Sequence, residues 1–138
     1  MTATSTAPEP TQPPKTTPFE MIGGTEPIRR VVDAFYDLLE SEPRYAELRA
    51  MHAPDMAPMR EALTGFFTGW MGGSREWFTA QGGFCVMTRH SKMPITEKTA
   101  KQWSDAMRAA LVVAAVEPGF AEQMDQILTR LAAGMVRE

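Results

Sequence analysis

MTRHSKMPI, residues 87–95, is the stretch around which the chain is organised. It contains His90, one of only two histidines in 138 residues, and Pro94 separates it from a long amphipathic segment. A single imidazole between two packed helices is either a hydrogen-bonded core residue or the one protein ligand of a large cofactor, because histidine is the commonest metal ligand. The choice between these two alternatives decides the functional class.

The composition is that of one globular domain. Hydrophobic residues make up 43% and charged residues 22% of the chain, which is enough apolar material for a core. The net charge of -3 argues against nucleic acid and against an anionic membrane surface as partners. No apolar run approaches the roughly 18 residues needed to span a bilayer. We therefore expect a monomer or a weak homodimer with no nucleic-acid and no membrane partner.

The N-terminal segment 1–17 is rich in Thr, Pro and Ala and has no large apolar side chain after Met1. Such a segment buries too little surface to offset its ordering entropy, so we expect a disordered extension at 1–17 and one domain at 18–138. The segment lacks the basic start and apolar run of a secretory signal. The single cysteine, Cys85, allows no internal disulfide and no cysteine-rich metal site. The cytoplasm is the simplest compartment for such a chain.

Apolar residues recur at helical spacing through the rest of the chain, and no stretch alternates convincingly with period two. A short helical turn at 18–22, ended by a Gly-Gly pair, is expected to precede three longer helices. The expected N-caps of these helices, in chain order, are Thr25, Asp55 and Thr96. Pro118 and Gly119 are expected to separate the third helix, at about 97–116, from a final helix that runs to the C-terminus. The pattern predicts an all-α domain.

No pairing of catalytic residues is recognisable: the chain has no His-x-x-x-His, no Glu-x-x-His, no glycine-rich phosphate loop and no Gly-x-Ser-x-Gly. What remains is His90 with three polar aromatic residues from other segments, Tyr36, His52 and Trp103, all among Met, Phe and Leu. One axial imidazole, an apolar slot and a few opposing donors are what a haem with a diatomic ligand requires. Taken singly, Tyr36 and Trp103 are also explained as core aromatics with a backbone partner. A helix-end position equally explains His52.

Several motifs follow one another in an order that is typical of one family. They are Phe35-Tyr36, His52-Ala53-Pro54, Phe66-x-x-x-Trp70-x-Gly72-Gly73, Arg89-His90 with Ile95 after it, and Trp103. Over about residues 19–136 the chain therefore resembles the truncated haemoglobins of group II. The resemblance implies an all-α, truncated globin-like, two-over-two helical sandwich that encloses haem b.

The resemblance also implies roles for single residues. His90 would be the proximal ligand of the haem iron. The residues that would stabilise a ligand on the distal side are Tyr36, Trp103 and His52. Those it implies around the cofactor are Phe35, Met59, Leu63, Phe66, Phe67, Trp77, Met87, Arg89, Met93, Ile95 and Met107. At Trp77 and Met87 the chain departs from the family, in which a tyrosine and an arginine at these positions often hold the haem propionates.

The leading interpretation is reversible binding of O2, with NO, CO and peroxide as further candidate ligands. Donors aimed at a bound ligand slow its release, and Tyr36 and Trp103 can each contribute about 1 kcal/mol or more in a dry pocket. Slow release favours sensing, scavenging or redox chemistry over oxygen delivery. A second interpretation is a haem redox enzyme, an NO dioxygenase or a peroxidase-like catalyst, which would need an external reductase because the chain has no flavin or nicotinamide motif. A third is a cofactor-free helical module that binds a partner helix.

Overall fold

The computed structural model describes residues 17–83 and 89–137, and within these ranges all regular secondary structure is helical. The elements, in chain order, are α1 (Pro18–Ile22), α2 (Thr25–Ser41), the 3-10 helix η1 (Pro43–Tyr45), α3 (Ala46–Ala50), α4 (Ala57–Trp70), α5 (Glu76–Ala80), α7 (Glu97–Val113) and α8 (Pro118–Ala133). Arg89 and His90 are also helical. The expected all-α class is confirmed. None of the described helices is both long and apolar enough to cross a bilayer.

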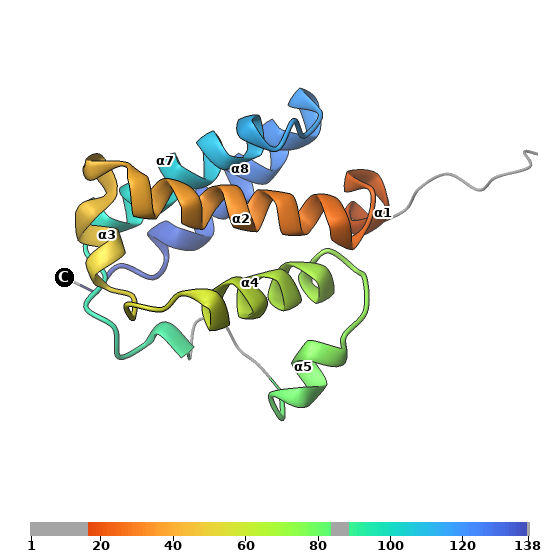
Figure 1. The fold of residues 1–138 in the computed structure, drawn as a ribbon. Helices are drawn as coiled ribbons and strands as arrows, with labels where there is room; N and C mark the ends of the chain where they lie inside the picture. The colour runs from red at the N-terminus through yellow and green to blue at the C-terminus, as the bar shows by residue number, and fades with distance from the viewer. Residues whose placement is uncertain (1–16, 84–88, 138) are drawn as a thin grey trace, which may run out of the picture.

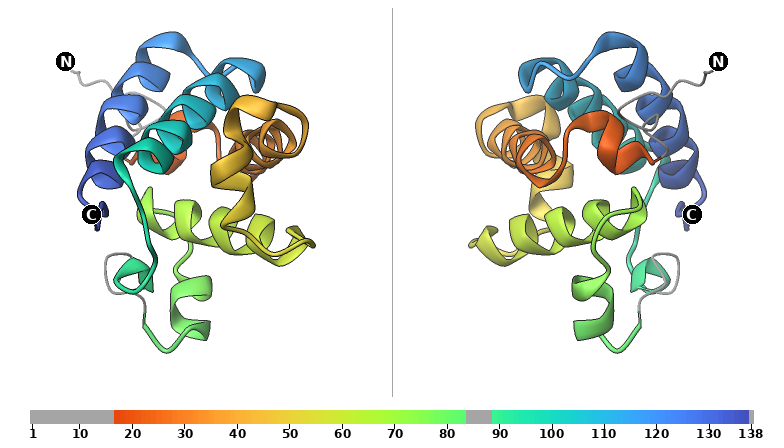
Figure 2. Two further views of the ribbon diagram at one scale, coloured as in Figure 1. Left: turned by 90° about the vertical axis from the view of Figure 1, so that its left-hand side faces the viewer. Right: turned by 90° about the vertical axis from the view of Figure 1, so that its right-hand side faces the viewer.

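The four long helices form two pairs, α2 with α4 and α7 with α8 (Figure 1). Helix α2 also packs against α7 and so joins the pairs, while the short α5 packs on α4. Figure 2 shows the same arrangement from both ends, with α4 on one side of α2 and the α7–α8 pair on the other. This is the expected two-over-two architecture.

The main core lies where α2 meets the other long helices. Its fully buried side chains come from all four, and the largest are Phe35, Phe67, Ile28, Met56, Met107, Leu111, Leu128 and Val32. The apolar stripe of α2 recurs every three or four residues, which is why one face of this helix can supply so many of them. A second, smaller cluster joins Ile95 and Ala100 to Ala132 and Met135, at the ends of α7 and α8.

At the start of two helices, polar side chains form hydrogen bonds that cap the first turn. The expected N-cap Thr96 is confirmed, because its hydroxyl accepts the Thr99 N–H at 3.1 Å and the Thr99 hydroxyl accepts the Thr96 N–H at 3.0 Å. Thr17 forms the same kind of capping box with Glu20 at the start of α1. The residue expected to end the N-terminal extension therefore begins the described fold.

The other two expected N-caps are wrong by one residue. Gly24 is the N-cap of α2, because the Gly-Gly pair turns the chain from α1 into α2 with φ of 107° and 95°, values that favour glycine. Met56 is the N-cap of α4, and its side chain makes no capping bond. Asp55 stands one residue earlier, where its Oδ1 accepts the Ala57 N–H at 3.0 Å.

Helix α7 ends at Val113, before the expected end near Val116. Ala115 adopts a φ of 60°, a left-handed conformation that cannot continue a right-handed helix. Pro118 does not only separate the two helices but opens α8, in a first turn where a missing N–H costs nothing. The Glu117 carboxylate accepts two backbone N–H groups of that turn, and these hydrogen bonds lower its pKa.

Candidate functional site

Helix α2 places Tyr36 inside the core with its hydroxyl unpaired. The residue is 2% exposed, and its ring meets the rings of Phe35 and His52 edge-on, at centroid distances of 5.0 and 5.9 Å. No hydrogen bond joins the Tyr36 hydroxyl to any other residue that the structure describes. Burial raises the pKa of Tyr36 to about 12, although the positive charge of Arg60 opposes the rise. At neutral pH the group is therefore a protonated donor that lacks an acceptor.

A second aromatic donor reaches the same place from α7. Trp103 is half-buried, and its ring lies edge-on to Phe35 at a centroid distance of 5.6 Å. It packs against both apolar clusters of the fold. Within the described ranges its indole N–H has no hydrogen-bond partner either. Two unpaired donors thus flank one phenylalanine, whereas core aromatics usually find partners for their polar atoms.

His52 follows α3 and belongs to the same group of rings. Its Nδ1 lies 2.9 Å from the Leu48 backbone oxygen, so Nδ1 carries the proton and Nε2 keeps a lone pair in the neutral ring. Burial lowers the pKa of His52, more than the Leu48 hydrogen bond raises it. Near neutral pH the imidazole therefore offers an acceptor, not a donor, at Nε2.

The segment that carries His90 is tied to the fold on its C-terminal side. His90 is half-buried, and its backbone oxygen accepts the Met93 N–H at 3.1 Å. Ile95 is buried, and its backbone oxygen accepts the Arg137 N–H at 2.7 Å, which links the segment to the chain beyond α8. The neighbouring Arg89 is exposed, with Nη2 3.4 Å from Oε1 of Gln81. Met87 and Cys85 lie outside the described residues.

Helix α4 and the following α5 supply aromatic side chains. Phe66 stacks on Trp70 at 5.9 Å and on Phe78 at 5.8 Å between centroids. A Cβ atom on Gly65 would lie 2.4 Å from Cγ of Trp77, so α5 packs directly on the backbone of α4. The other residues expected around the cofactor are Phe67 and Met107, which are buried, Leu63, which is half-buried, and Met59 and Met93, which are 39% and 44% exposed.

These residues fit a flat apolar cofactor with a polar ligand on one face. Helix α4 packs against α2 and α5 but not closely against α7 or α8, although its apolar side chains from Ala62 to Trp70 are buried or half-buried. The Tyr36 hydroxyl and the Trp103 indole N–H make no hydrogen bond within the described residues, so both are available to donate to a ligand. No cluster of three His, Cys, Asp or Glu occurs in the described part of the chain.

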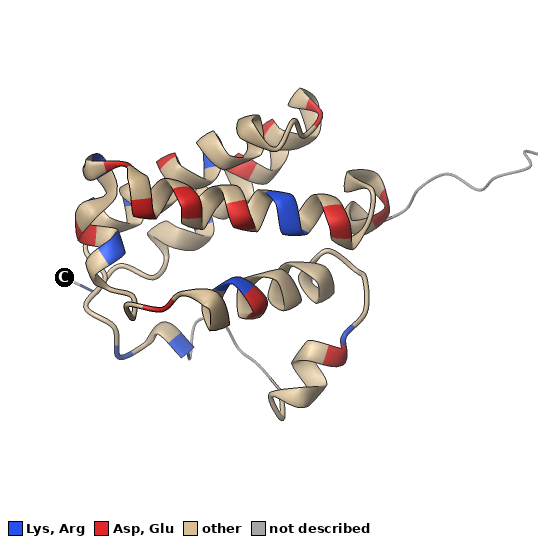
Figure 3. Ribbon diagram, viewed as in Figure 1, with Lys and Arg blue, Asp and Glu red and all other residues tan. Residues whose placement is uncertain are grey.

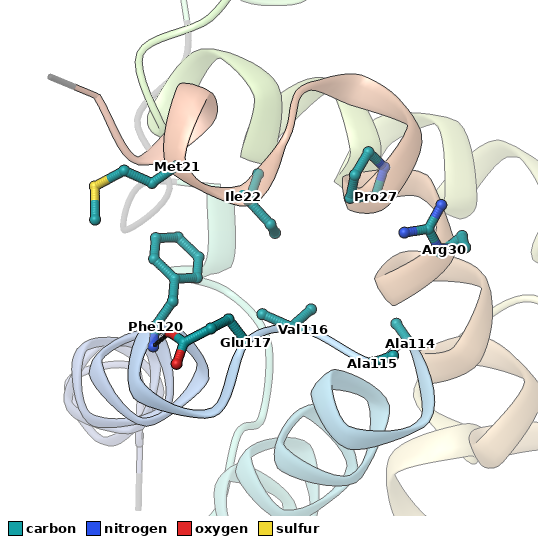
Figure 4. A pocket seen from close by; sticks show the side chains of 9 residues that line it. All are labelled: Met21, Ile22, Pro27, Arg30, Ala114, Ala115, Val116, Glu117 and Phe120. Carbon is teal, nitrogen blue, oxygen red and sulfur yellow. Dashed lines mark hydrogen bonds between the residues drawn. The ribbon is translucent and has the colours of Figure 1, made fainter. Parts of the chain in front are cut away.

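A small pocket of about 80 Å³ lies elsewhere, between α1, α2 and the α7–α8 turn (Figure 4). Ile22 and Phe120 form part of its apolar lining. Its charged groups are already engaged, because Arg30 lies 2.7 Å from Glu26 and Glu117 caps α8. None of the residues expected around the cofactor lines this pocket, which is therefore separate from the candidate site.

Two polar residues of α4 were not predicted from the sequence. Arg60 binds three carboxylates of α2. The only sign of this in the sequence was the spacing of these acidic residues along one face of the helix, which indicates that a positive charge lies opposite them. Thr64 is buried, and its hydroxyl has no hydrogen-bond partner among the described atoms. Nothing in the sequence around Thr64 pointed to this.

A family model for bacterial-like globins matches residues 17–137. Among similar solved structures, the hemoglobin of the thermophilic phototrophic bacterium Chloroflexus aurantiacus is 31% identical, covering 90% of this chain and 100% of that one, with a TM-score of 0.80. The group II 2-on-2 hemoglobin of the plant pathogen Agrobacterium tumefaciens is 26% identical, with coverages of 89% and 95% and a TM-score of 0.83. The truncated oxygen-avid haemoglobin of Bacillus subtilis is 27% identical, with coverages of 88% and 100% and a TM-score of 0.80. No curated protein matches significantly.

The architecture is thus that of the truncated two-over-two haemoglobins, with group II members among the structural neighbours. The chain belongs to the bacterial-like globin family. It is a haem-binding globin, because haem is the cofactor that membership of this family implies.

Proposed function

We propose that the protein binds a diatomic ligand, O2 in the first place, reversibly at the iron of haem b, and releases it slowly. The observation that carries this proposal is the pair of unpaired donors beside Phe35, the Tyr36 hydroxyl and the Trp103 indole N–H. The Bacillus subtilis relative, which is named oxygen-avid, supports the choice of ligand.

His90 is the residue we propose as the protein ligand of the iron. Its position at the end of a helical turn, half-buried and anchored through Ile95, supports this role, because a cofactor ligand needs a fixed backbone. The haem iron, when bound, supplies the position that a diatomic ligand occupies. The lining that we propose for the cofactor consists of Phe35, Leu63, Phe66, Phe67, Trp77, Ile95 and Met107, with Met59, Met93 and Arg89 towards its edge.

Tyr36 and Trp103 are proposed to act as donors to the ligand. Both are attached to long helices, and both pack edge-on against the same buried ring, that of Phe35. A donor held in this way is already oriented before the ligand arrives, so little side-chain entropy opposes the hydrogen bond. The raised pKa of Tyr36 keeps its proton in place throughout the neutral range. Slow ligand release follows from two such bonds.

His52 is proposed to have a different role from the two donors. Because Nδ1–H is directed at the Leu48 oxygen, Nε2 can accept a hydrogen bond but cannot donate one until the ring is protonated. Burial lowers the pKa of His52, so protonation requires a pH below the ordinary range of histidine. His52 therefore stabilises the ligand only under acidic conditions.

The proposal is tested with Trp103→Phe, measured as the O2 dissociation rate of the haem-bound protein by stopped flow. Loss of one donor worth about 1 kcal/mol predicts a rise of about fivefold or more. Trp70→Phe is the matched control, because Trp70 is also half-buried but stacks on Phe66 and makes no ring contact with Phe35. The O2 dissociation rate of this variant is expected to stay at the wild-type value. An unchanged rate in Trp103→Phe would remove this residue from the distal site.

A further inference from the structure

Arg60 joins α4 to the part of α2 that carries Tyr36. Its Nη1 lies 3.0 Å from Oδ1 and 3.2 Å from the backbone oxygen of Asp33, and its Nη2 lies 2.8 Å from Oδ1 of Asp37. The same Nη2 lies 3.4 Å from Oε1 of Glu40. Figure 3 shows acidic positions spaced along α2 and the short charged stretch of α4 opposite them. One guanidinium therefore spans two turns of the neighbouring helix.

The same guanidinium lies against the ring of Tyr36. The Arg60 Cζ atom is 5.7 Å from the ring centroid, within the range of a cation–π contact. Phe35 and His52 meet the ring edge-on from other elements. The phenol ring is thus enclosed by a neighbour on α2, a histidine after α3 and a cation on α4. Tyr36 cannot reorient unless one of these three moves.

The charge of Arg60 also acts on the Tyr36 hydroxyl. A nearby positive charge favours the ionised form, which is why Arg60 opposes the rise in the pKa of Tyr36. The same field polarises the O–H bond and makes it a stronger donor. Partial burial opposes the charge on Arg60 itself, but the hydrogen bonds and the negative charges of Asp37 and Asp33 together outweigh burial and raise the pKa of Arg60. Arg60 therefore remains charged.

We propose that Arg60 is a positioning residue for ligand binding, which holds the Tyr36 ring and the surrounding turn of α2 so that the hydroxyl faces the ligand. The inference rests on the distal role proposed for Tyr36, because Arg60 affects the ligand only by holding Tyr36 in position. A second ion pair joins the same two helices, between Arg29 and Glu61, with Nη1 2.9 Å from Oε2. Where the structure describes it, that pair has no aromatic ring beneath the guanidinium.

The test compares Arg60→Met with Arg29→Gln in the full-length, haem-bound protein. Arg60→Met breaks three ion pairs between α2 and α4 and Arg29→Gln breaks one, but only the first variant removes a contact with Tyr36. For Arg60→Met we expect the O2 dissociation rate to rise about two- to fivefold, since a single cation–π contact and its field are lost. CO is a poor hydrogen-bond acceptor, so its dissociation rate should change little. Arg29→Gln should leave both rates at the wild-type values.

A double mutant separates positioning from general destabilisation. In a Tyr36→Phe background no hydroxyl remains to be oriented, so Arg60→Met should cause no further rise in the O2 rate. Arg60→Lys serves if the methionine variant does not fold. It keeps the charge but loses the forked hydrogen bonds, so its O2 rate should rise above the wild-type value.

Three results would overturn the inference. The first is a wild-type O2 dissociation rate in both Arg60 variants while Tyr36→Phe releases O2 faster, and the second is an equal rise in the O2 and CO dissociation rates of Arg60→Met. The third is an effect of Arg60→Met that is just as large in the Tyr36→Phe background as in the wild type. If instead Tyr36→Phe itself leaves the O2 rate unchanged, the proposed distal role of Tyr36 fails, and with it the basis of this inference. The single Tyr36→Phe variant therefore distinguishes the two failures.

Discussion

Replacing Tyr36 by phenylalanine removes one oxygen atom from a ring whose other contacts remain. The hydroxyl makes no hydrogen bond within the described structure, so the change breaks no internal bond and should leave the fold intact. Its only predicted effect on ligand binding is the loss of a donor. Because Tyr36 is 2% exposed, water competes little for the hydrogen bond to the ligand. The bond should therefore contribute about 1–1.5 kcal/mol, at the upper end of the usual range for a hydrogen bond. At about 1.4 kcal/mol per factor of ten, the O2 dissociation rate should rise roughly five- to tenfold.

The assay is stopped-flow displacement of O2 from the haem-bound protein. Tyr45→Phe is the matched control, because Tyr45 is another buried tyrosine of the same core, and its ring lies against Arg44, away from the group of rings around Tyr36. We expect the control to keep the wild-type rate. An unchanged rate in Tyr36→Phe, or an equal rise in Tyr45→Phe, would refute the reasoning that Tyr36 is a specific donor.

The effect of Tyr36 on the O2 dissociation rate should depend on pH, because only the protonated hydroxyl can donate a hydrogen bond. Tyrosine in water loses its proton near pH 10, whereas burial raises the pKa of Tyr36 to about 12. The donor is present below the folded-state pKa and is lost above it. The wild-type O2 dissociation rate should therefore show no change from ionisation of Tyr36 up to about pH 11. A rise with a midpoint near pH 10 that Tyr36→Phe abolishes would show that the hydroxyl is solvated.

Two further predictions concern stability. The pKa of His52 is lowered from 6.5, so the unfolded chain takes up that proton first, and the free energy of unfolding should begin to fall as pH drops below 6.5. His52→Gln should flatten this part of a urea-unfolding series between about pH 7 and 5.5, and an unaltered slope would contradict the burial of His52. Thr64→Val replaces a buried hydroxyl that lacks a partner among the described atoms, so the free energy of unfolding should rise by about 1 kcal/mol. Thr68→Val should lower the free energy of unfolding, because it removes the hydroxyl that donates a 2.8 Å hydrogen bond to the backbone oxygen of Thr64. Destabilisation by Thr64→Val would mean that the hydroxyl is satisfied.

Helix ends could be predicted from the sequence only where the residues that determine them lie close together in the chain. The Thr96 cap could be predicted because both partners of its capping box lie within four residues of each other. Thr25 and Asp55 are equally suitable cap residues by type, but the N-caps in the structure are Gly24 and Met56. At Thr25 the left-handed glycines before it fix where the turn ends, and these φ values are not visible in the sequence.

The candidate site divides in a similar way. Tyr36, His52, Trp103 and His90 could be named from their order in the chain and its resemblance to a family. That the rings of Tyr36 and Trp103 both contact Phe35, and that neither donor has a partner among the described residues, depends on the packing of α2 against α7. Arg60 could not be found at all, because its role exists only once α4 brings it against Asp33, Asp37 and Tyr36.

The most direct test of the account is the absorption spectrum of the protein supplied with haem, in ferric, ferrous and ferrous-CO forms. The wild type and His52→Gln should both show a Soret band with a histidine-ligated ferrous-CO spectrum. His90→Gly should lose that spectrum and regain it when free imidazole is added to replace the missing ligand. A normal spectrum in His90→Gly without imidazole, or no Soret band in the wild type, would contradict the assignment of His90 as the iron ligand.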